Sequence, residues 1–276
     1  PEKRAVESNA CDLRKSGCKT IANFCESGRY TTIFSDNSTA TVTVEVPDNI
    51  QLTNWQLKVE DWNEGEKKIT EENRGRGYVT REVWYETDKR FLTVENTELK
   101  PWKDIPEIGS EVAGIGHYST TFQLPLNWGE SNGAVLKING STNGNPVFVT
   151  INGMRSKPVN SKTLSVDVSE LLQPGENTIQ IDVPTPLNNR MKARGYYTAI
   201  ISETIDAYRL LHPDITANLP DTDSILAMPE EEQKQLIFST LGHMAPLIQY
   251  GSRAIYQDNG IVGNVQLITY VHHDFL

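Results

Sequence analysis

Apolar and polar residues alternate along the middle of the chain, between residues 114 and 186. Tyr118, Thr120 and Phe122 alternate with polar neighbours, which is the period-two pattern of a strand with one buried face. Three further β-rich runs follow, over residues 134–138, 148–151 and 177–183. Short strands at this spacing predict a sandwich of two antiparallel sheets.

Turn residues separate these runs. Asn152-Gly153 directly follows the run at 148–151, and Asn-Gly favours a tight hairpin because both central residues of a type I′ turn need positive φ. Residues 167–172 predict one helical turn, which Pro174-Gly175 ends. The central segment therefore predicts strands linked by tight turns.

The flanking segments predict more strands and a small helical part. β-rich runs before the central segment cover residues 30–34, 40–46, 55–59, 78–85 and 91–94. The charged, glycine-bearing stretch 64–77 predicts a solvated loop. Helical spacing occurs at 199–211 and 229–241.

These patterns divide the chain into three parts. We expect a Cys-containing N-terminal segment at 1–27 and an accessory β-sheet segment at 28–95. Residues 96–276 are expected to form the β-sandwich, with a helical insertion at about 194–250.

Several motifs of the central segment occur in a known order. Gly114, Gly116 and Tyr118 open a strand, Trp128 follows, a later run ends at Asn152-Gly153, and residues 167–179 read DVSELLQPGENTI. This order resembles the sugar-binding jelly-roll domain of family 2 glycoside hydrolases. The resemblance implies an all-β, galactose-binding-like β-sandwich (jelly roll), a fold that many enzymes carry.

Two later segments resemble a related family. TPLNNRM at 185–191 and YQDNGIVGNVQL at 256–267 are similar to the closing segments of the C-terminal sandwich in large α-L-rhamnosidase-like enzymes, as in family 106. All matched pieces together cover roughly half the chain. The catalytic barrel of those enzymes has no counterpart in the sequence, so the resemblance implies an accessory part. The helical pair departs from the family, which runs more directly to its last strands.

The composition excludes some partners. The 276 residues include 26 Lys and Arg against 36 Asp and Glu, which gives a formal net charge of −10. This balance argues against a nucleic-acid partner, because phosphate binding draws on Lys and Arg. No run approaches the ~20 apolar residues of a membrane span, so we expect no membrane partner. No apolar leader opens the sequence, so we expect a mature chain, a cytosolic chain or one cut from a longer precursor.

Three cysteines lie close together near the start of the sequence. Cys11, Cys18 and Cys25 have a spacing that is not a zinc signature, and no His lies near them. We expect one disulfide and one odd thiol; the alternative is three free thiols in a cytosolic protein. Asn37 and Asn139 begin N-glycosylation sequons on predicted turns, which favours a secreted, extracellular protein.

Residues 101–116 predict a long irregular approach to the first central strand, and loops of this length are often functional. Trp102 either stacks on a sugar ring, with Asp104 and Glu107 nearby to take its hydroxyls, or plugs one end of the sandwich. Asp104, Glu107 and Glu111 also fit two bolder hypotheses. One is a glycosidase acid–base pair, which needs carboxylates about 5 to 9 Å apart; the other is a structural calcium site. We expect no other cofactor.

Asn188, Asn189 and Arg190 directly follow a core strand. Two amides and a guanidinium suit several sugar hydroxyls or a uronate carboxylate, because Arg makes bidentate contacts with carboxylates. The alternative is that these groups join the sandwich to a neighbouring segment.

Three functional hypotheses follow. The first is a non-catalytic carbohydrate-binding sandwich, forming part or a cleaved subunit of a secreted rhamnosidase-like glycoside hydrolase or related polysaccharide-degrading enzyme. The second is a free-standing secreted lectin. The third is a glycosidase in its own right that uses the loop carboxylates. The expected partners are a plant or microbial polysaccharide and, in the first case, a catalytic chain or domain of the same precursor. The sequence has no HExxH motif or P-loop.

Overall fold

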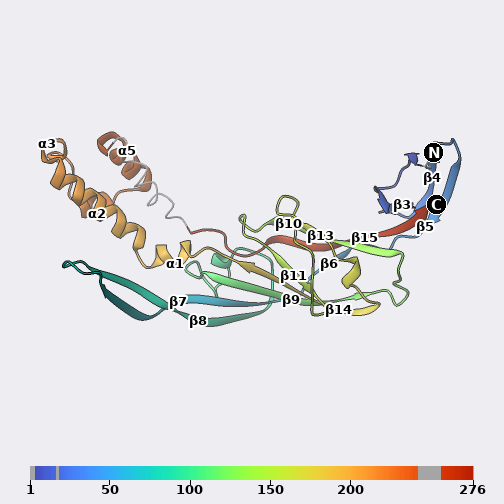
Figure 1. Ribbon diagram of the computed structural model, residues 1–276, viewed down its shortest axis with the longest axis horizontal. Coiled ribbons are helices and arrows are strands. Elements are labelled where there is room, and N and C mark those ends of the chain that lie inside the picture. Colours follow the sequence, from blue (N-terminus) through green and yellow to red (C-terminus); the bar gives the residue numbers. More distant parts are fainter. Residues whose placement is uncertain (1–3, 17–18, 242–255, 276) are drawn as a thin grey trace.

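The computed structural model describes residues 4–16, 19–241 and 256–275. The protein is an all-β sandwich with a small helical part, as the sequence predicts. Figure 1 shows an elongated molecule, with the sandwich in the middle, the helices at one end and the N-terminal strands at the other.

Two six-stranded antiparallel sheets form the sandwich. The first has the order β13–β10–β15–β3–β2, and β6 also pairs with β15. Its strands are β2 (Asp12–Ser16), β3 (Lys19–Phe24), β6 (Ile50–Leu52), β10 (Asn132–Ser141), β13 (Ser165–Asp167) and β15 (Val262–Phe275). The sheet therefore joins β2 and β3, near the start of the chain, to β15 near its end.

The second sheet has the order β12–β11–β14–β9–β7–β8. Its strands are β7 (Trp55–Asn73), β8 (Val79–Thr97), β9 (Gly114–Leu124), β11 (Phe148–Ile151), β12 (Met154–Arg155) and β14 (Gly175–Pro184). Alternate residues of both sheets, such as Tyr118, Ile181, Leu136 and Leu267, form one buried core. The predicted alternation along β9 is thereby confirmed.

The Gly-Ile-Gly start of β9 is required by close packing. A Cβ atom on Gly114 would lie 1.9 Å from the carbonyl oxygen of Glu60 on β7. A Cβ atom on Gly116 would lie 2.5 Å from the ring of Trp102. These glycines let β9 pair with β7 and leave room for an indole beneath it.

The predicted tight turns are present. Asn152 and Gly153 have φ angles of 51° and 80° and join β11 to β12. The predicted helical turn is η2 (Ser169–Leu171). Both features confirm the predicted tight turn and the predicted helical turn between central strands.

A small module lies at the N-terminal end of the sandwich. β1 (Ala5–Glu7), β4 (Gly28–Phe34) and β5 (Thr39–Val44) form a three-stranded sheet. Ala22, Phe24, Phe34, Val44 and Phe275 form a second core, which joins this sheet to β3 and to the end of β15. Cys11 and Cys25 form a disulfide in this module, and Cys18 lies outside the described residues.

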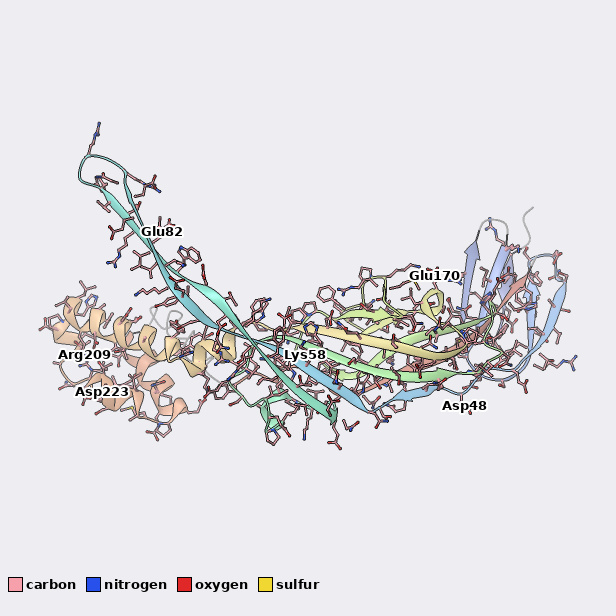
Figure 2. All side chains as sticks on the ribbon, turned by 90° about the horizontal axis from the view of Figure 1, so that it is seen from below. Asp48, Lys58, Glu82, Glu170, Arg209 and Asp223 are labelled. Atoms are coloured by element: carbon pink, nitrogen blue, oxygen red, sulfur yellow. A yellow bond between two sulfur atoms is a disulfide. The ribbon has the colours of Figure 1, made fainter. Side chains whose placement is uncertain are left out.

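The predicted loop at 64–77 is wrong. Strand β7 continues to Asn73 and pairs with β8, so that residues 62–90 form a long two-stranded ribbon, here called the arm. Figure 2 shows the arm, which carries Glu82, projecting away from the sandwich. Opposite charges lie across its strands, with Glu71 3.7 Å from Arg81 and Lys68 3.7 Å from Glu86. Opposite charges therefore face each other across this charged ribbon.

The helical part follows β14. Its helices are α1 (Asn188–Ala193), α2 (Tyr196–Leu211), α3 (Pro213–Thr216), α4 (Thr222–Leu226) and α5 (Glu230–Leu241). Ile205 of α2 and Ile225 of α4 form its small core. The predicted helices at 199–211 and 229–241 are confirmed, and residues 242–250 of the predicted insertion lie outside the described residues. None of the described helices has the length and apolarity needed to cross a membrane.

Candidate functional site

Trp102 is a structural plug in the sandwich. It opens η1 (Trp102–Asp104), its side chain is only 1% exposed, and its Nε1 donates to Tyr118 Oη at 2.8 Å. The amide of Ile261 donates to the same oxygen at 3.1 Å, and burial raises the pKa of Tyr118 to about 12. The sugar-stacking hypothesis for Trp102 is wrong, because its ring presents no open face.

The loop carboxylates lie on the surface of the protein. Asp104, Glu107 and Glu111 are exposed on the surface of the loop that Trp102 anchors. The neighbouring Lys103 pairs with Asp258 at 2.6 Å. Among the described residues, no group of three or more His, Cys, Asp or Glu side chains is placed to hold a metal ion. The calcium site therefore stays a prediction without structural support.

Asn188, Asn189 and Arg190 join α1 to neighbouring segments. Asn189 Nδ2 donates to the carbonyl of Gln257 at 3.0 Å, and the Gln257 amide donates to Asn189 Oδ1 at 2.8 Å. Arg190 Nη2 donates to Asp61 Oδ1 at 2.5 Å. Of the two interpretations of this triplet, the contacts favour the structural junction.

Asp61 lies at the centre of this junction. Its side chain is fully buried, and Arg90 from β8 donates to Asp61 Oδ2 at 2.6 Å. Burial tends to raise the pKa of Asp61, but hydrogen bonds from Asn63, Arg190 and Arg90 outweigh it and hold the pKa below its ordinary 3.8.

Some polar atoms of the same junction are buried without a partner. Asn188 Nδ2, Arg190 Nε and Gln257 Oε1 make no hydrogen bond in the described part of the chain. Buried groups of this kind usually bond to ordered water. We therefore expect the junction to be hydrated.

His117 lies between two carboxylates on the outer face of the second sheet. Its Nδ1 is 2.8 Å from Asp182 Oδ1 and its Nε2 is 3.4 Å from Glu60 Oε1. A hydrogen bond from Lys89 is the main cause that lowers the pKa of Glu60. Both ring nitrogens have partners, as expected for a structural histidine.

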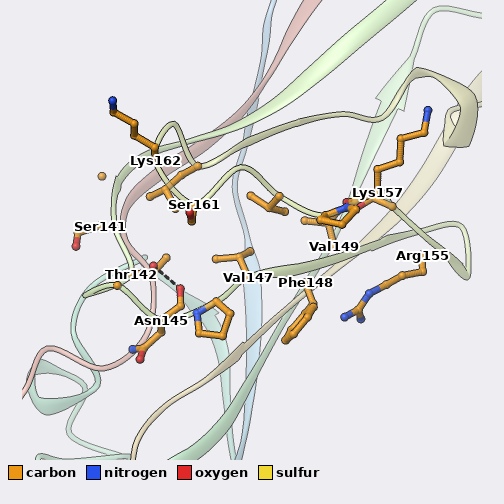
Figure 3. Close-up of a pocket in the computed structure, with 17 residues that line it drawn as sticks. Ser141, Thr142, Asn145, Val147, Phe148, Val149, Arg155, Lys157, Ser161 and Lys162 are labelled. Carbon is orange, nitrogen blue, oxygen red and sulfur yellow. Dashed lines mark hydrogen bonds between the residues drawn. The ribbon is translucent and has the colours of Figure 1, made fainter.

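A pocket opens between two loops of the sandwich, here called the loop pocket. It has a volume of about 670 Å³ and is lined from residues 140–149 and 155–164. This volume lies within the range of about 300–1,000 Å³ found for small-molecule sites. Apolar walls come from Pro146, Val147, Val149, Pro158, Val159 and Leu164, and hydroxyl or amide groups come from Ser141, Thr142, Asn145, Ser156 and Ser161. Figure 3 shows these side chains around the opening.

Turn chemistry fixes both loops of the pocket. Asn143 and Gly144 have positive φ angles, and the Asn145 amide donates to the Thr142 carbonyl at 3.0 Å. In the other loop, Asn160 Oδ1 accepts from the amides of Lys162 and Thr163 at 2.9 and 3.1 Å. Asn-Gly turns and Asn side chains that accept backbone bonds hold such loops in one conformation. The pocket is therefore preformed.

Phe148 and Arg155 form one edge of the loop pocket. The Phe148 side chain is 40% exposed, and the Arg155 guanidinium carbon lies 4.4 Å from its ring centroid. Arg155 Nη1 lies 3.6 Å from Asp182 Oδ2. None of the lining residues is Asp or Glu, so the pocket holds no carboxylate pair.

A second, more open hollow lies on the outer face of the second sheet. It has a volume of about 500 Å³ and is lined largely by uncharged polar residues, among them Gln56, Ser119, Thr121 and Gln180. No aromatic side chain lines it. The loop pocket is the stronger candidate, because it combines apolar walls, polar groups and an exposed ring.

The sequence prediction missed the loop pocket, although the sequence contains a signal for it. No Asp or Glu occurs between Glu130 and Asp167, whereas the whole chain has 36 acids in 276 residues. Arg155, Lys157 and Lys162 all lie in this acid-free stretch.

The two sequons lie in different surroundings. Asn37 is exposed on the turn between β4 and β5. Asn139 lies on β10, and its Nδ2 donates to Asn264 Oδ1 at 3.0 Å. Glycosylation at Asn37 and Asn139 stays a prediction.

No family model matches the sequence, and no curated protein matches it. Among solved structures, the chain is similar to a rhamnosidase from Novosphingobium sp. PP1Y, with 14% identity and a TM-score of 0.43 over 98% of this chain and 25% of that chain. It is similar to a β-glucuronidase from an uncultured Clostridium sp., with 17% identity and a TM-score of 0.33 over 52% of this chain and 23% of that chain. It is also similar to an α-L-rhamnosidase from Aspergillus terreus, with 16% identity and a TM-score of 0.23 over 63% of this chain and 24% of that chain. The chain thus spans about a quarter of the Novosphingobium rhamnosidase, and these likenesses assign it to no family.

Proposed function

We propose that the protein is a non-catalytic carbohydrate-binding β-sandwich and that the loop pocket is its binding site. It acts as an accessory part, or a cleaved subunit, of a glycoside hydrolase or related polysaccharide-degrading enzyme. Its ligand is a plant or microbial polysaccharide, and a catalytic chain or domain of the same precursor is its partner. The resemblance of residues 114–191 and 256–267 to glycoside hydrolase sandwiches supports this proposal.

The composition of the loop pocket carries the proposal. A sugar ring has apolar C–H faces and a rim of hydroxyl groups, so its site combines apolar walls with a few placed polar groups. Val147, Val159 and Leu164 supply such walls, and Ser141 and Ser161 supply hydroxyls at the opening.

The surroundings of the pocket favour binding without hydrolysis. Glycoside hydrolysis needs two carboxylates flanking the scissile bond at about 5 to 9 Å from each other. The lining of the loop pocket contains none, and the loop carboxylates Asp104 and Glu107 belong to a different segment. The catalytic step is therefore assigned to a partner chain or domain.

Secretion is part of the same proposal. The Cys11–Cys25 disulfide and the exposed sequon at Asn37 fit an oxidising, extracellular compartment. Such a compartment is also where polysaccharides are degraded.

Binding of the full chain to an array of plant and microbial polysaccharides tests the proposal, together with an assay for released reducing sugar. We expect binding without release. Phe148→Ala should weaken binding about tenfold, because it removes an aromatic surface worth about 1 kcal/mol or more. Phe91→Ala is the matched control, since that ring is also exposed and carries a stacked cation, Lys58, at 4.5 Å.

Two results would contradict the proposal. One is sugar release by the isolated chain, which would make it an enzyme in its own right. The other is binding that Phe91→Ala abolishes and Phe148→Ala leaves unchanged, which would move the site away from the loop pocket.

A further inference from the structure

The loop pocket is positively charged within an acidic protein. Arg155, Lys157 and Lys162 line it and no Asp or Glu does, although the chain has a net charge of −10. At physiological salt, charges farther away than about 8–10 Å are largely screened. The nearby charges, rather than the net charge of the chain, therefore set the potential at the pocket.

These cations are available to a ligand. Lys162 makes no ion pair within the described residues. Lys157 has Glu170 at 3.6 Å, and Arg155 has Asp182 at 3.6 Å, and neither acid lines the pocket. The Lys157–Glu170 pair is exposed and therefore weak, so a bound anion can replace Glu170 there. Arg155 approaches Asp182 through Nη1, which leaves its other N–H donors for an anion.

Phe148 holds Arg155 in one orientation. The guanidinium lies over the ring at 4.4 Å, and stacking of this kind leaves the donor edge of the guanidinium free for a carboxylate. Figure 3 shows the Arg155 guanidinium directed toward Phe148, with Lys157 and Lys162 on opposite sides of the opening. The oriented guanidinium of Arg155 and the flexible ammonium groups of Lys157 and Lys162 thus lie around the loop pocket.

We infer that the loop pocket takes an acidic carbohydrate, an oligomer of hexuronates whose carboxylates bind Arg155, Lys157 and Lys162 around the opening while its hydroxyls bind Ser141 and Ser161. This inference rests on the proposed function, because it names the class of sugar for the same site. It also accounts for the acid-free stretch between Glu130 and Asp167, since a carboxylate at the opening would repel such a ligand.

The test compares charged and neutral forms of the same sugars. Calorimetry measures binding of the full chain to trimers of galacturonate, glucuronate and guluronate, to their carboxyl-reduced counterparts and to a sulfated neutral trimer. A uronate trimer is expected to bind at least about tenfold more tightly than its reduced form at 0.1 M salt, and less so at 1 M, where the screening length falls to about 3 Å. Lys162→Gln and Arg155→Gln should each remove most of this difference. Lys67→Gln, an exposed lysine on the arm, should not.

The other possible results would overturn either the charge inference alone or the proposed function as well. Equal or tighter binding of reduced trimers, or of the neutral glycans on the array, overturns the charge inference and leaves the proposed function intact. Binding of no saccharide at all overturns both. Preference for the sulfated trimer overturns the carboxylate assignment. Uronate binding that Lys162→Gln and Arg155→Gln leave unchanged, in variants whose melting temperatures match the parent, places the acidic site elsewhere.

Discussion

At the scale of single residues, Asp61 joins three elements through its charge. Its buried carboxylate on β7 accepts hydrogen bonds from Arg190 of α1 and Arg90 of β8. Breaking such a pair leaves a buried charge without compensation, which costs about 3–5 kcal/mol. This carboxylate therefore stabilises the attachment of the helical part to the sandwich.

We expect Asp61→Asn to lower the free energy of unfolding at pH 7 by about 3 kcal/mol. Because the folded pKa of Asp61 lies below 3.8, its contribution is present above about pH 4 and is lost as the pH falls through the folded pKa. Urea unfolding between pH 3 and pH 7 should show a flatter pH dependence in the variant at the acid end. Asp104→Asn, an exposed aspartate, is the control and should change little.

Tyr118 satisfies two buried donors with one oxygen. Tyr118→Phe leaves the Trp102 indole N–H and the Ile261 amide without a partner, and we expect it to destabilise the fold by about 2 kcal/mol or more. Urea unfolding measures this loss, and Tyr85→Phe on the arm is an exposed control. Loss of glycan binding with unchanged stability would instead make the Trp102 loop part of a binding site.

At the scale of elements, the arm is separate from the core. Most of its apolar side chains, including Ile69, Val83 and Trp84, are exposed, and an isolated two-stranded ribbon is marginally stable. Replacing residues 65–86 with Asn-Gly keeps Glu64 opposite Thr87. We expect the shortened protein to unfold with a free energy within about 1 kcal/mol of the parent in urea. A loss of several kcal/mol would show that the arm packs on the sandwich.

The N-terminal module depends on its disulfide. Cys11 and Cys25 are 14 residues apart, and closing a loop of about 15 residues stabilises a fold by about 3 kcal/mol. The double variant Cys11→Ser, Cys25→Ser should open this module first. Hydrogen exchange should rise over β2 and β3, whose hairpin the disulfide closes, and over β1, β4 and β5, while β9 and β14 stay protected. Equal loss of protection in both regions would contradict an independently stabilised module.

At the scale of the whole molecule, the sequence predicts the sandwich and the helical part but not the arm. The alternation around Tyr118 and the Asn152-Gly153 turn are local signals, and both are confirmed. The arm was not predicted, because its strands pair across a turn that no sequence signal marked. In the sequence alone, Glu71 and Arg81 are typical of a solvated loop, and only the paired strands bring them together. Likewise, Arg190 has the chemistry of a ligand-binding residue. Its ion pair with Asp61 was not predicted, because the two residues are far apart in the sequence.

The candidate site also depends on contacts that the sequence alone does not reveal. An exposed tryptophan and a buried one look alike in a sequence, and only the fold places Trp102 beneath Gly116 and against Tyr118. The loop pocket needs two turns separated by a hairpin, so no single motif marks it. Its one sequence signal is a property of composition, the absence of acids between Glu130 and Asp167.

The central claim is that the loop pocket binds carbohydrate, and hydrogen–deuterium exchange with and without a bound glycan tests it most directly. The ligand is the tightest binder from the array and the uronate panel. We predict that protection on binding falls within residues 140–164 and leaves residues 101–116 and 188–190 unchanged. Protection confined to either of those two segments, or no protection with any glycan, would contradict it.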